Sequence, residues 1–183
     1  MTAASIITLA RIALIPVFMW AVNSSYQYSA VLALLIFMVA SVTDAVDGYV
    51  ARRFNQITNF GKFIDPLADK LLVVSALLMF VQLGQMSAWA AMIIIAREFL
   101  VTSLRTVAMA EGIVIAAGWE GKLKTFVQII CIAFLLTGQG APELIRDSGI
   151  TWDQMVVWLM VAVTVWSGVS YLIRHREVLR NPK

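Results

Sequence analysis

The sequence predicts an all-α fold, an integral membrane bundle of six transmembrane helices with both termini in the cytoplasm. Two features of its composition point to this class: 61% of the 183 residues are hydrophobic and only 14% are charged. A soluble domain carries about 25% charged residues, and a soluble chain of this length could not bury so much apolar surface. The length predicts a single domain over 1–183.

Six continuous apolar stretches have the length of about 20 residues that a helix needs to cross a bilayer. They are expected near 3–22, 30–52, 61–83, 87–110, 122–140 and 152–173. Helices are expected because backbone polar groups inside lipid must be satisfied within the segment. The first stretch is interpreted as a retained helix rather than a signal peptide, since it lacks a basic start and contains Arg11 midway. The segment 111–121 is either a helix extension or an interfacial loop.

The distribution of basic residues predicts the orientation of the spans. The links at 23–29 and 84–86 carry no charge, and the link at 141–151 holds a single basic residue, Arg146. The remaining links and the tail hold Arg52, Arg53 and Lys62, then Arg105, Lys122 and Lys124, then Arg174, Arg176, Arg180 and Lys183. These basic regions are therefore expected in the cytoplasm, which also places both termini there. Trp20, Trp89 and Trp152 near the span ends are typical of an aromatic belt.

Four aspartates lie at the predicted cytoplasmic ends of the second and third spans: Asp44, Asp47, Asp65 and Asp69. Spacings of three and four keep each pair on one helical face, and the short link makes the two helices antiparallel neighbours. Carboxylates grouped in this way are either protonated or hold cations among them. Oxygen ligands suit hard cations such as Mg²⁺ or Mn²⁺. Two such ions can stabilise the attacking and leaving oxygens of a phosphoryl displacement.

Small and basic residues continue the helical face of Asp44. Gly48 and Ala51 leave room for a bulky ligand near the backbone, and Arg52 offers a planar fork for phosphate oxygens. Taken singly, an aspartate at a span end is usually solvated, and glycine or alanine in a membrane helix usually serves packing. Their combination within a short segment favours a cation and ligand site.

The string Asp44-x2-Asp47-Gly48-x2-Ala51-Arg52-x8-Gly61-x3-Asp65-x3-Asp69 resembles the signature of the CDP-alcohol phosphotransferase family at every fixed position and gap. The six expected spans also agree with the family fold. The resemblance implies that the four aspartates bind two divalent cations and that Asp69 is also the general base for the acceptor hydroxyl. It implies donor contacts, to CDP-diacylglycerol, from Thr8, Gly48, Ala51, Arg52, Thr58 and Gly61.

Further features resemble the family members that use glycerol 3-phosphate as the acceptor and make phosphatidylglycerophosphate and CMP. These features are Thr8-Leu-Ala-Arg11 followed by Pro16, Ala96-Arg97-Glu98, and Gly121-Lys122-Leu-Lys124-Thr125. Cations level with the acids suit an acceptor that carries a phosphate, so Arg97, Arg105, Lys122 and Lys124 are expected to bind it. The positive-inside bias alone is an alternative explanation for the two lysines, and a structural ion pair is an alternative role for Arg97. Arg97 therefore ranks below Arg105 as a candidate for acceptor binding.

Other hypotheses stay open at this point. The acceptor could be phosphatidylglycerol, giving cardiolipin, or an inositol phosphate, and a cation transporter is a remote alternative because intramembrane acids occur in ion pathways. The resemblance implies a homodimer in the bacterial cytoplasmic (inner) membrane with its active site facing the cytoplasm. Ala4-Ser5 departs from the Pro-Asn common in such members. No nucleic-acid binding is expected, Cys131 is expected to serve packing, and His175 to be solvated.

Overall fold

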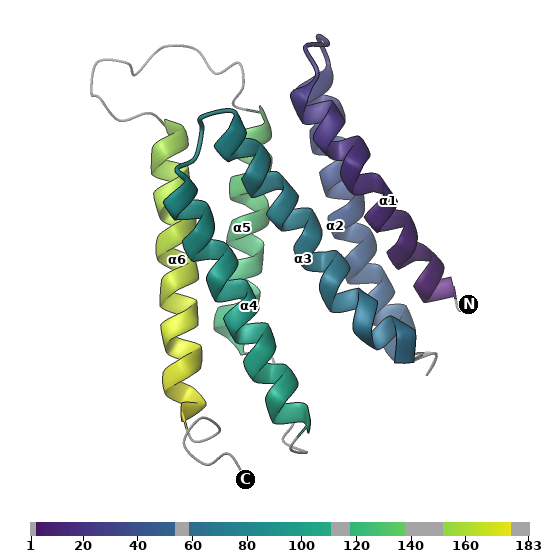
Figure 1. The fold of residues 1–183 in the computed structure, drawn as a ribbon, viewed down its shortest axis with the longest axis vertical. Helices are drawn as coiled ribbons and strands as arrows, with labels where there is room; N and C mark the ends of the chain where they lie inside the picture. Colours follow the sequence, from purple (N-terminus) through teal and green to yellow (C-terminus); the bar gives the residue numbers. More distant parts are fainter. Residues whose placement is uncertain (1–2, 54–58, 111–117, 138–151, 177–183) are drawn as a thin grey trace. The chain divides into compact units, whose positions relative to one another are not determined.

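The computed structural model describes residues 3–53, 59–110, 118–137 and 152–176; the side chains of 3–7, 44–53, 59–67, Asp69 and Ala110 lie outside this description. Within these ranges the regular elements are all α-helices. In chain order they are α1 (Ala3–Asn23), α2 (Ser29–Arg53), α3 (Asn59–Gln82), α4 (Ala88–Ala110), α5 (Trp119–Thr137) and α6 (Trp152–Arg174) (Figure 1). The all-α prediction is confirmed, and five of the six helices begin within two residues of the expected positions.

Local sequence accounts for the boundaries between α3 and α4. Gly84 has a positive φ of 72°, the left-handed conformation that commonly terminates a helix. Ser87 then caps α4, because its hydroxyl oxygen accepts a hydrogen bond from the amide of Trp89 at 3.3 Å. α5 begins at Trp119, three residues before the expected start at residue 122. The predicted span begins at Lys122, where the long apolar run starts, whereas the helix also includes Glu120 before it.

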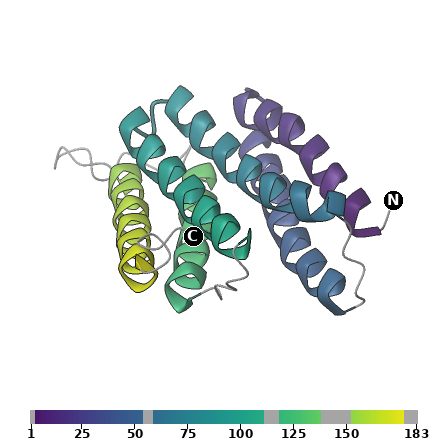
Figure 2. The same cartoon turned by 60° about the horizontal axis from the view of Figure 1, so that its bottom comes forward.

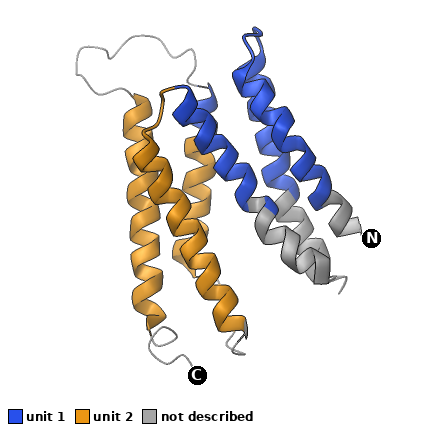
Figure 3. Cartoon of the chain, in the orientation of Figure 1, with its two compact units in different colours: residues 1–83, 133–142 blue, residues 84–132, 143–183 orange. Residues whose placement is uncertain are grey.

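Two compact units are distinguished by packing: residues 1–83 with 133–142, and residues 84–132 with 143–183 (Figure 3). In the first unit, α1 lies along both α2 and α3 (Figures 1 and 2). Phe18 of α1 meets Phe37 of α2 with ring centroids 6.0 Å apart. Asn23 at the end of α1 accepts a hydrogen bond from Gln82 at the end of α3 at 3.2 Å. The expected single domain over 1–183 remains a prediction.

The interior of the first unit contains many small apolar side chains that are almost fully buried: Ala21, Ala33, Ala40, Ala68 and Ala76. Small residues at helix interfaces allow the backbones to approach closely, which is the usual way that helices associate in lipid. Larger side chains such as Leu77 and Phe80 fill the space between these contacts. In the second unit α4 packs against α6 with charged and hydroxyl groups buried beside apolar residues such as Ile94 and Met160, and the first unit likewise buries Thr8 and Arg11.

Threonine hydroxyls in three helices bond within their own helix. Thr43, Thr106 and Thr125 donate to the carbonyl oxygens four residues earlier, at 2.6, 3.0 and 3.0 Å. This arrangement satisfies the hydroxyl without any partner from another element.

One helix in the described ranges, α6, is long and apolar enough to cross a membrane by length and composition. Thr8–Asn23, Ser29–Thr43 and Lys70–Gln82 form shorter apolar helical stretches. Charged residues explain part of the difference from six expected spans, since α4 contains Arg97, Glu98 and Arg105 within its length. The six spans and the cytoplasmic termini therefore remain predictions, whereas the six helices are observed.

Candidate functional site

The aspartate cluster predicted from the sequence lies on two helices of one unit. Asp44 and Asp47 fall in the last three turns of α2, and Asp65 and Asp69 fall in the first half of α3. Both helices pack against α1. The four carboxylate side chains lie outside the described residues, as do the side chains of the predicted donor-binding residues Gly48, Ala51, Arg52 and Gly61, and all of Thr58.

Thr8 is the one predicted donor-binding residue whose side chain is described. It is buried on α1, and so is Arg11, one turn later and 2% exposed. Both side chains are engaged by other groups of the chain, although Nε of Arg11 is buried without a hydrogen-bond partner. A buried arginine is costly unless its charge is compensated. The polar side of α1 is therefore turned into the interior of the unit that also contains α2 and α3.

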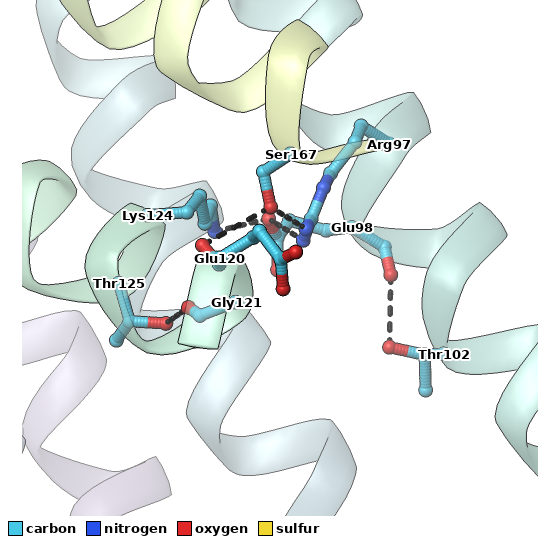
Figure 4. Close-up of polar contacts among 8 residues, drawn as sticks. All are labelled: Arg97, Glu98, Thr102, Glu120, Gly121, Lys124, Thr125 and Ser167. Atoms are coloured by element: carbon cyan, nitrogen blue, oxygen red, sulfur yellow. Dashed lines mark hydrogen bonds and ion pairs between the residues drawn. The ribbon is translucent and has the colours of Figure 1, made fainter. Parts of the chain in front are cut away.

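A second polar region, in the other unit, joins α4 and α5 through an ion pair (Figure 4). The ammonium group of Lys124 and the guanidinium of Arg97 both contact the same carboxylate oxygen, Oε1 of Glu98, the latter at 3.3 Å. Lys124 is 3% exposed. Two cations thus share one carboxylate in a largely buried setting, where electrostatic interactions are stronger than in water.

Arg97 also connects α4 to α6. Its Nη2 donates a hydrogen bond to the hydroxyl oxygen of Ser167 at 2.7 Å, and that hydroxyl donates in turn to the backbone oxygen of Glu120 in α5 at 3.2 Å (Figure 4). Gly168 makes room for this arrangement, because a Cβ placed there would lie 2.9 Å from Cγ of Arg97. Arg97 and Glu98 pair with each other, and each also contacts another helix, Arg97 through Ser167 and Glu98 through Lys124.

The first turn of α5 is held by a further ion pair on the exposed side. The carboxylate of Glu120 accepts hydrogen bonds from both terminal nitrogens of Arg174. The pKa of the Glu120 carboxyl lies below its ordinary value, first because of hydrogen bonding to its own backbone amide and then because of Arg174, with partial burial acting in the opposite direction. Glu120 lies just ahead of the span predicted over 122–140.

The four predicted acceptor-binding residues fall into two kinds. Arg97 and Lys124 are engaged with Glu98. Arg105 and Lys122 make no ion pair within the described part of the chain, and Nε of Arg105 is buried without a hydrogen-bond partner. Lys122 is exposed, whereas Lys124 is buried. Their role in binding an acceptor is not tested by these positions and remains a prediction.

Sequence reasoning did not identify Ser167, Gly168, Glu120 or Arg174 as parts of a site. A signal was present in α6, where polar residues recur at Thr164, Ser167, Tyr171 and Arg174. Spacings of three, four and three residues place such side chains on one helical face, so a polar stripe inside an apolar helix could have been predicted. Two of these residues carry buried polar atoms without a hydrogen-bond partner, the hydroxyls of Thr164 and Tyr171.

Two single residues with no assigned role also have defined places. Cys131 is a buried free cysteine, as expected for a packing residue. His175 is only partly exposed, and its ring lies 4.7 Å from the ring of Tyr171. It is therefore less solvated than the sequence predicted, because the amide of His175, just past the end of α6, still donates to the carbonyl oxygen of Tyr171 at 3.1 Å and brings the two rings together.

The polar region of α4, α5 and α6 suits an anion better than a bond-breaking reaction. Arg97 and Lys124 share the carboxylate of Glu98, and the carboxylate of Glu120 is paired with Arg174, so positive charge prevails among these side chains. No group of three or more histidine, cysteine, aspartate or glutamate side chains that could hold a metal ion occurs among the described residues.

Comparisons with known proteins give the same family as the aspartate pattern. A sequence model described as CDP-alcohol phosphatidyltransferase matches residues 1–166. The chain is 42% identical to the CDP-diacylglycerol–glycerol-3-phosphate 3-phosphatidyltransferase of Bacillus subtilis (strain 168), over 95% of each chain. It is 34% identical to the protein of that name from Rickettsia bellii, over 90% of each chain. It is 37% identical to a probable phosphatidylglycerophosphate synthase of Mycobacterium tuberculosis, over 93% of this chain and 80% of the relative. Because the match spans nearly the whole sequence, the chain belongs to the CDP-alcohol phosphatidyltransferase family.

Proposed function

We propose that this protein transfers the phosphatidyl group of CDP-diacylglycerol to glycerol 3-phosphate, giving phosphatidylglycerophosphate and CMP. The observation that carries the proposal is the 42% identity, over 95% of both chains, to the Bacillus subtilis protein whose name states this reaction. Other acceptors, phosphatidylglycerol or an inositol phosphate, would use the same chemistry with a different acceptor site.

In this reaction a hydroxyl oxygen of glycerol 3-phosphate attacks the phosphorus that bears the lipid. A new phosphorus–oxygen bond forms, the bond from that phosphorus to the oxygen bridging to CMP breaks, and CMP leaves with the electron pair. Asp69 accepts the proton of the attacking hydroxyl as general base. No covalent intermediate with the protein is needed, so the residues act by positioning the reactants and by stabilising charge.

The aspartates of α2 and α3 would hold the divalent cations: Asp44, Asp47, Asp65 and Asp69. Dependence on divalent cations is general in the family, and an all-carboxylate set suits Mg²⁺ or Mn²⁺. Two bound ions would neutralise the charge that develops on the phosphate oxygens. The donor's nucleotide would lie beside them, against Thr8, Gly48, Ala51, Arg52, Thr58 and Gly61. The burial of Thr8 on the helix that packs against α2 and α3 supports its inclusion.

The phosphate of the acceptor would be bound by the basic residues of α4 and α5: Arg97, Arg105, Lys122 and Lys124. The unequal charge of this group supports the proposal, because Arg97 and Lys124 share a single carboxylate. Arg105 also has a buried Nε that donates to no group in the described part of the chain. A phosphomonoester would supply the negative charge and the acceptor oxygens that such cations attract.

We propose that the protein lies in the bacterial cytoplasmic membrane as a homodimer, with six spans and with both termini and the active site on the cytoplasmic side. Side-chain exposure supports the membrane setting. Large apolar residues are exposed on every helix, including Trp89 at 81% and Trp158 at 62%, whereas Arg11, Lys124 and Gln128 are buried. Exposed apolar patches of this extent mark a surface that contacts lipid or protein, and buried charges are expected inside a membrane bundle.

Product analysis tests the proposal directly. The purified protein is incubated with CDP-diacylglycerol, glycerol 3-phosphate and Mg²⁺ or Mn²⁺, and CMP is measured. Release of CMP should require all three components, and the lipid product should be phosphatidylglycerophosphate. Faster CMP release with phosphatidylglycerol or inositol phosphate would reject this acceptor and keep the chemistry. Metal flux into proteoliposomes without any lipid substrate, and no CMP release, would indicate a transporter instead.

A further inference from the structure

Ser167 of α6 is the point at which α4, α5 and α6 are joined by buried hydrogen bonds (Figure 4). Its hydroxyl accepts from Arg97 of α4 and donates to the backbone oxygen of Glu120 of α5, and the residue is 1% exposed. We propose that Ser167 is a positioning residue for glycerol 3-phosphate, holding the first turns of α5 in place through Arg97 and Glu120. This inference rests on the proposed function.

The neighbouring glycine makes the link specific. A Cβ at Gly168 would lie 2.9 Å from Cγ of Arg97, closer than side chains normally approach. Because Cγ is near the backbone of Arg97, it cannot move aside without carrying the guanidinium with it. Ser167 therefore holds the guanidinium of Arg97, while the absence of a side chain at Gly168 leaves room for Cγ of Arg97. A hydroxyl is suited to the central position because it accepts one hydrogen bond and donates another.

The backbone of Glu120 matters because the two basic residues of α5 follow it directly. Lys122 and Lys124 lie two and four residues later on the same helix. A shift of the backbone at Glu120 would therefore move both lysine side chains. The other link to this turn, between the Glu120 carboxylate and Arg174, holds a flexible side chain whose partner is 57% exposed. Solvent and salt weaken exposed pairs, which leaves the buried link through Ser167 as the stronger constraint.

The first test is Ser167→Ala, measured by steady-state CMP release with each substrate varied in turn. The KM for glycerol 3-phosphate should rise about threefold to tenfold, as expected for the loss of one hydrogen bond. The KM for CDP-diacylglycerol should stay within about twofold, because the donor site lies on other helices. Ser103→Ala is the matched control, since Ser103 is an exposed residue of α4.

Gly168→Ala is a second variant that removes no polar group. It should reproduce the rise in KM for glycerol 3-phosphate by displacing Arg97. Ser103→Ala serves as its control as well, because Ser103 is exposed on α4. A double variant, Ser167→Ala with Arg97→Met, should raise the KM for glycerol 3-phosphate by less than the product of the two single effects, since the bond between Arg97 and Ser167 is lost in either single variant.

The outcomes separate the two proposals. No CMP release by the wild-type protein with glycerol 3-phosphate would reject the proposed function before any variant is compared. Given wild-type activity, three results would each overturn the positioning role of Ser167. The first is an unchanged KM for glycerol 3-phosphate in both Ser167→Ala and Gly168→Ala. The second is an equal rise in the KM values for both substrates together with a lowered Tm. The third is a KM for glycerol 3-phosphate in the double variant that rises by the product of the two single effects.

Discussion

The two compact units differ in the polar contacts that the structure describes inside them. The unit of α1, α2 and α3 closes around small apolar residues such as Ala33 and Ala76, with Thr8 and the charge of Arg11 buried on α1. The unit built on α4 and α6 buries Lys124, Ser167 and Thr164 along with its apolar residues, and connects three helices by polar contacts. Close apolar packing gives a rigid support for chemistry at the helix ends, whereas a polar interior gives directional contacts that place particular side chains.

This difference has a functional meaning under the proposed reaction. Phosphoryl transfer needs carboxylates held at fixed separations for the cations, and a tightly packed scaffold of helices provides this rigidity. Recognition of a charged acceptor needs cations whose position and net charge are set. The polar interior supplies both, because Glu98 compensates only one of the two cations that contact it.

The largest expected effect is on catalysis by a residue in the first half of α3. Asp69→Asn should lower the rate of CMP release by about 10²-fold to 10⁴-fold, the usual contribution of a general base, while CDP-diacylglycerol binding is largely retained. Turnover and donor binding, measured separately, test this expectation. Asp153→Asn in the first turn of α6 serves as the control and should leave the rate unchanged. A near-normal rate for Asp69→Asn would exclude Asp69 as the base.

The second effect is on the stability of the polar unit. Glu98→Gln leaves Lys124 and Arg97 without their shared carboxylate, and removal of one partner from a buried ion pair costs about 3–5 kcal/mol of unfolding free energy. Unfolding of the purified protein, followed by loss of helical circular dichroism in a denaturing detergent titration, measures this. Unchanged stability would mean that the cations find other compensation and that Glu98 is not their principal partner.

The third effect concerns the apolar unit. Ala33→Leu should lower the unfolding free energy by about 1–3 kcal/mol, because extra methylene groups in a well-packed interior force the helices apart. Ala162→Leu is the matched control, since Ala162 is exposed on α6 and should tolerate the larger side chain. The same titration compares the two variants. Equal stabilities would show that the interior of the first unit is not closely packed at Ala33.

The smallest effect is the pH dependence of the exposed pair between Glu120 and Arg174. Because the folded pKa of Glu120 is lowered, its contribution to stability is present above the ordinary glutamate pKa of about 4.3. It is lost as the pH falls through the folded value. The Tm of the wild type should exceed that of Glu120→Gln at pH 7, and the difference should vanish on acidification. A difference that increases toward low pH would contradict the assignment.

The sequence predicted the helices well because each is a nearly continuous apolar run with clear interruptions. It could not distinguish the lysines of α5, since charge patterns place Lys122 and Lys124 at the same end of the helix without specifying their directions. Positions two apart on a helix point about 200° apart, and Lys124 is buried while Lys122 is exposed. The helix period therefore predicts different surroundings for the two residues, although the charge pattern does not.

The polar link through Ser167 was harder to predict for a physical reason. Arg97 and Ser167 are 70 residues apart in the chain, and their contact depends on the packing of α4 against α6. The role of Gly168 depends on that same packing, because a glycine in an apolar helix normally indicates only close approach to some neighbour. By contrast, the helix period alone predicts that the two aspartates of each pair share one face of their helix.

The threonines that bond within their own helices bear on how such a chain enters a membrane. A hydroxyl that already donates to the carbonyl one turn earlier, as in Thr106 and Thr125, brings no unsatisfied donor into hydrocarbon. Under the proposed arrangement of six spans, scales that score threonine as a polar residue then overstate the cost of inserting α4 and α5. Replacing such threonines with valine should change insertion efficiency less than a residue-by-residue count suggests.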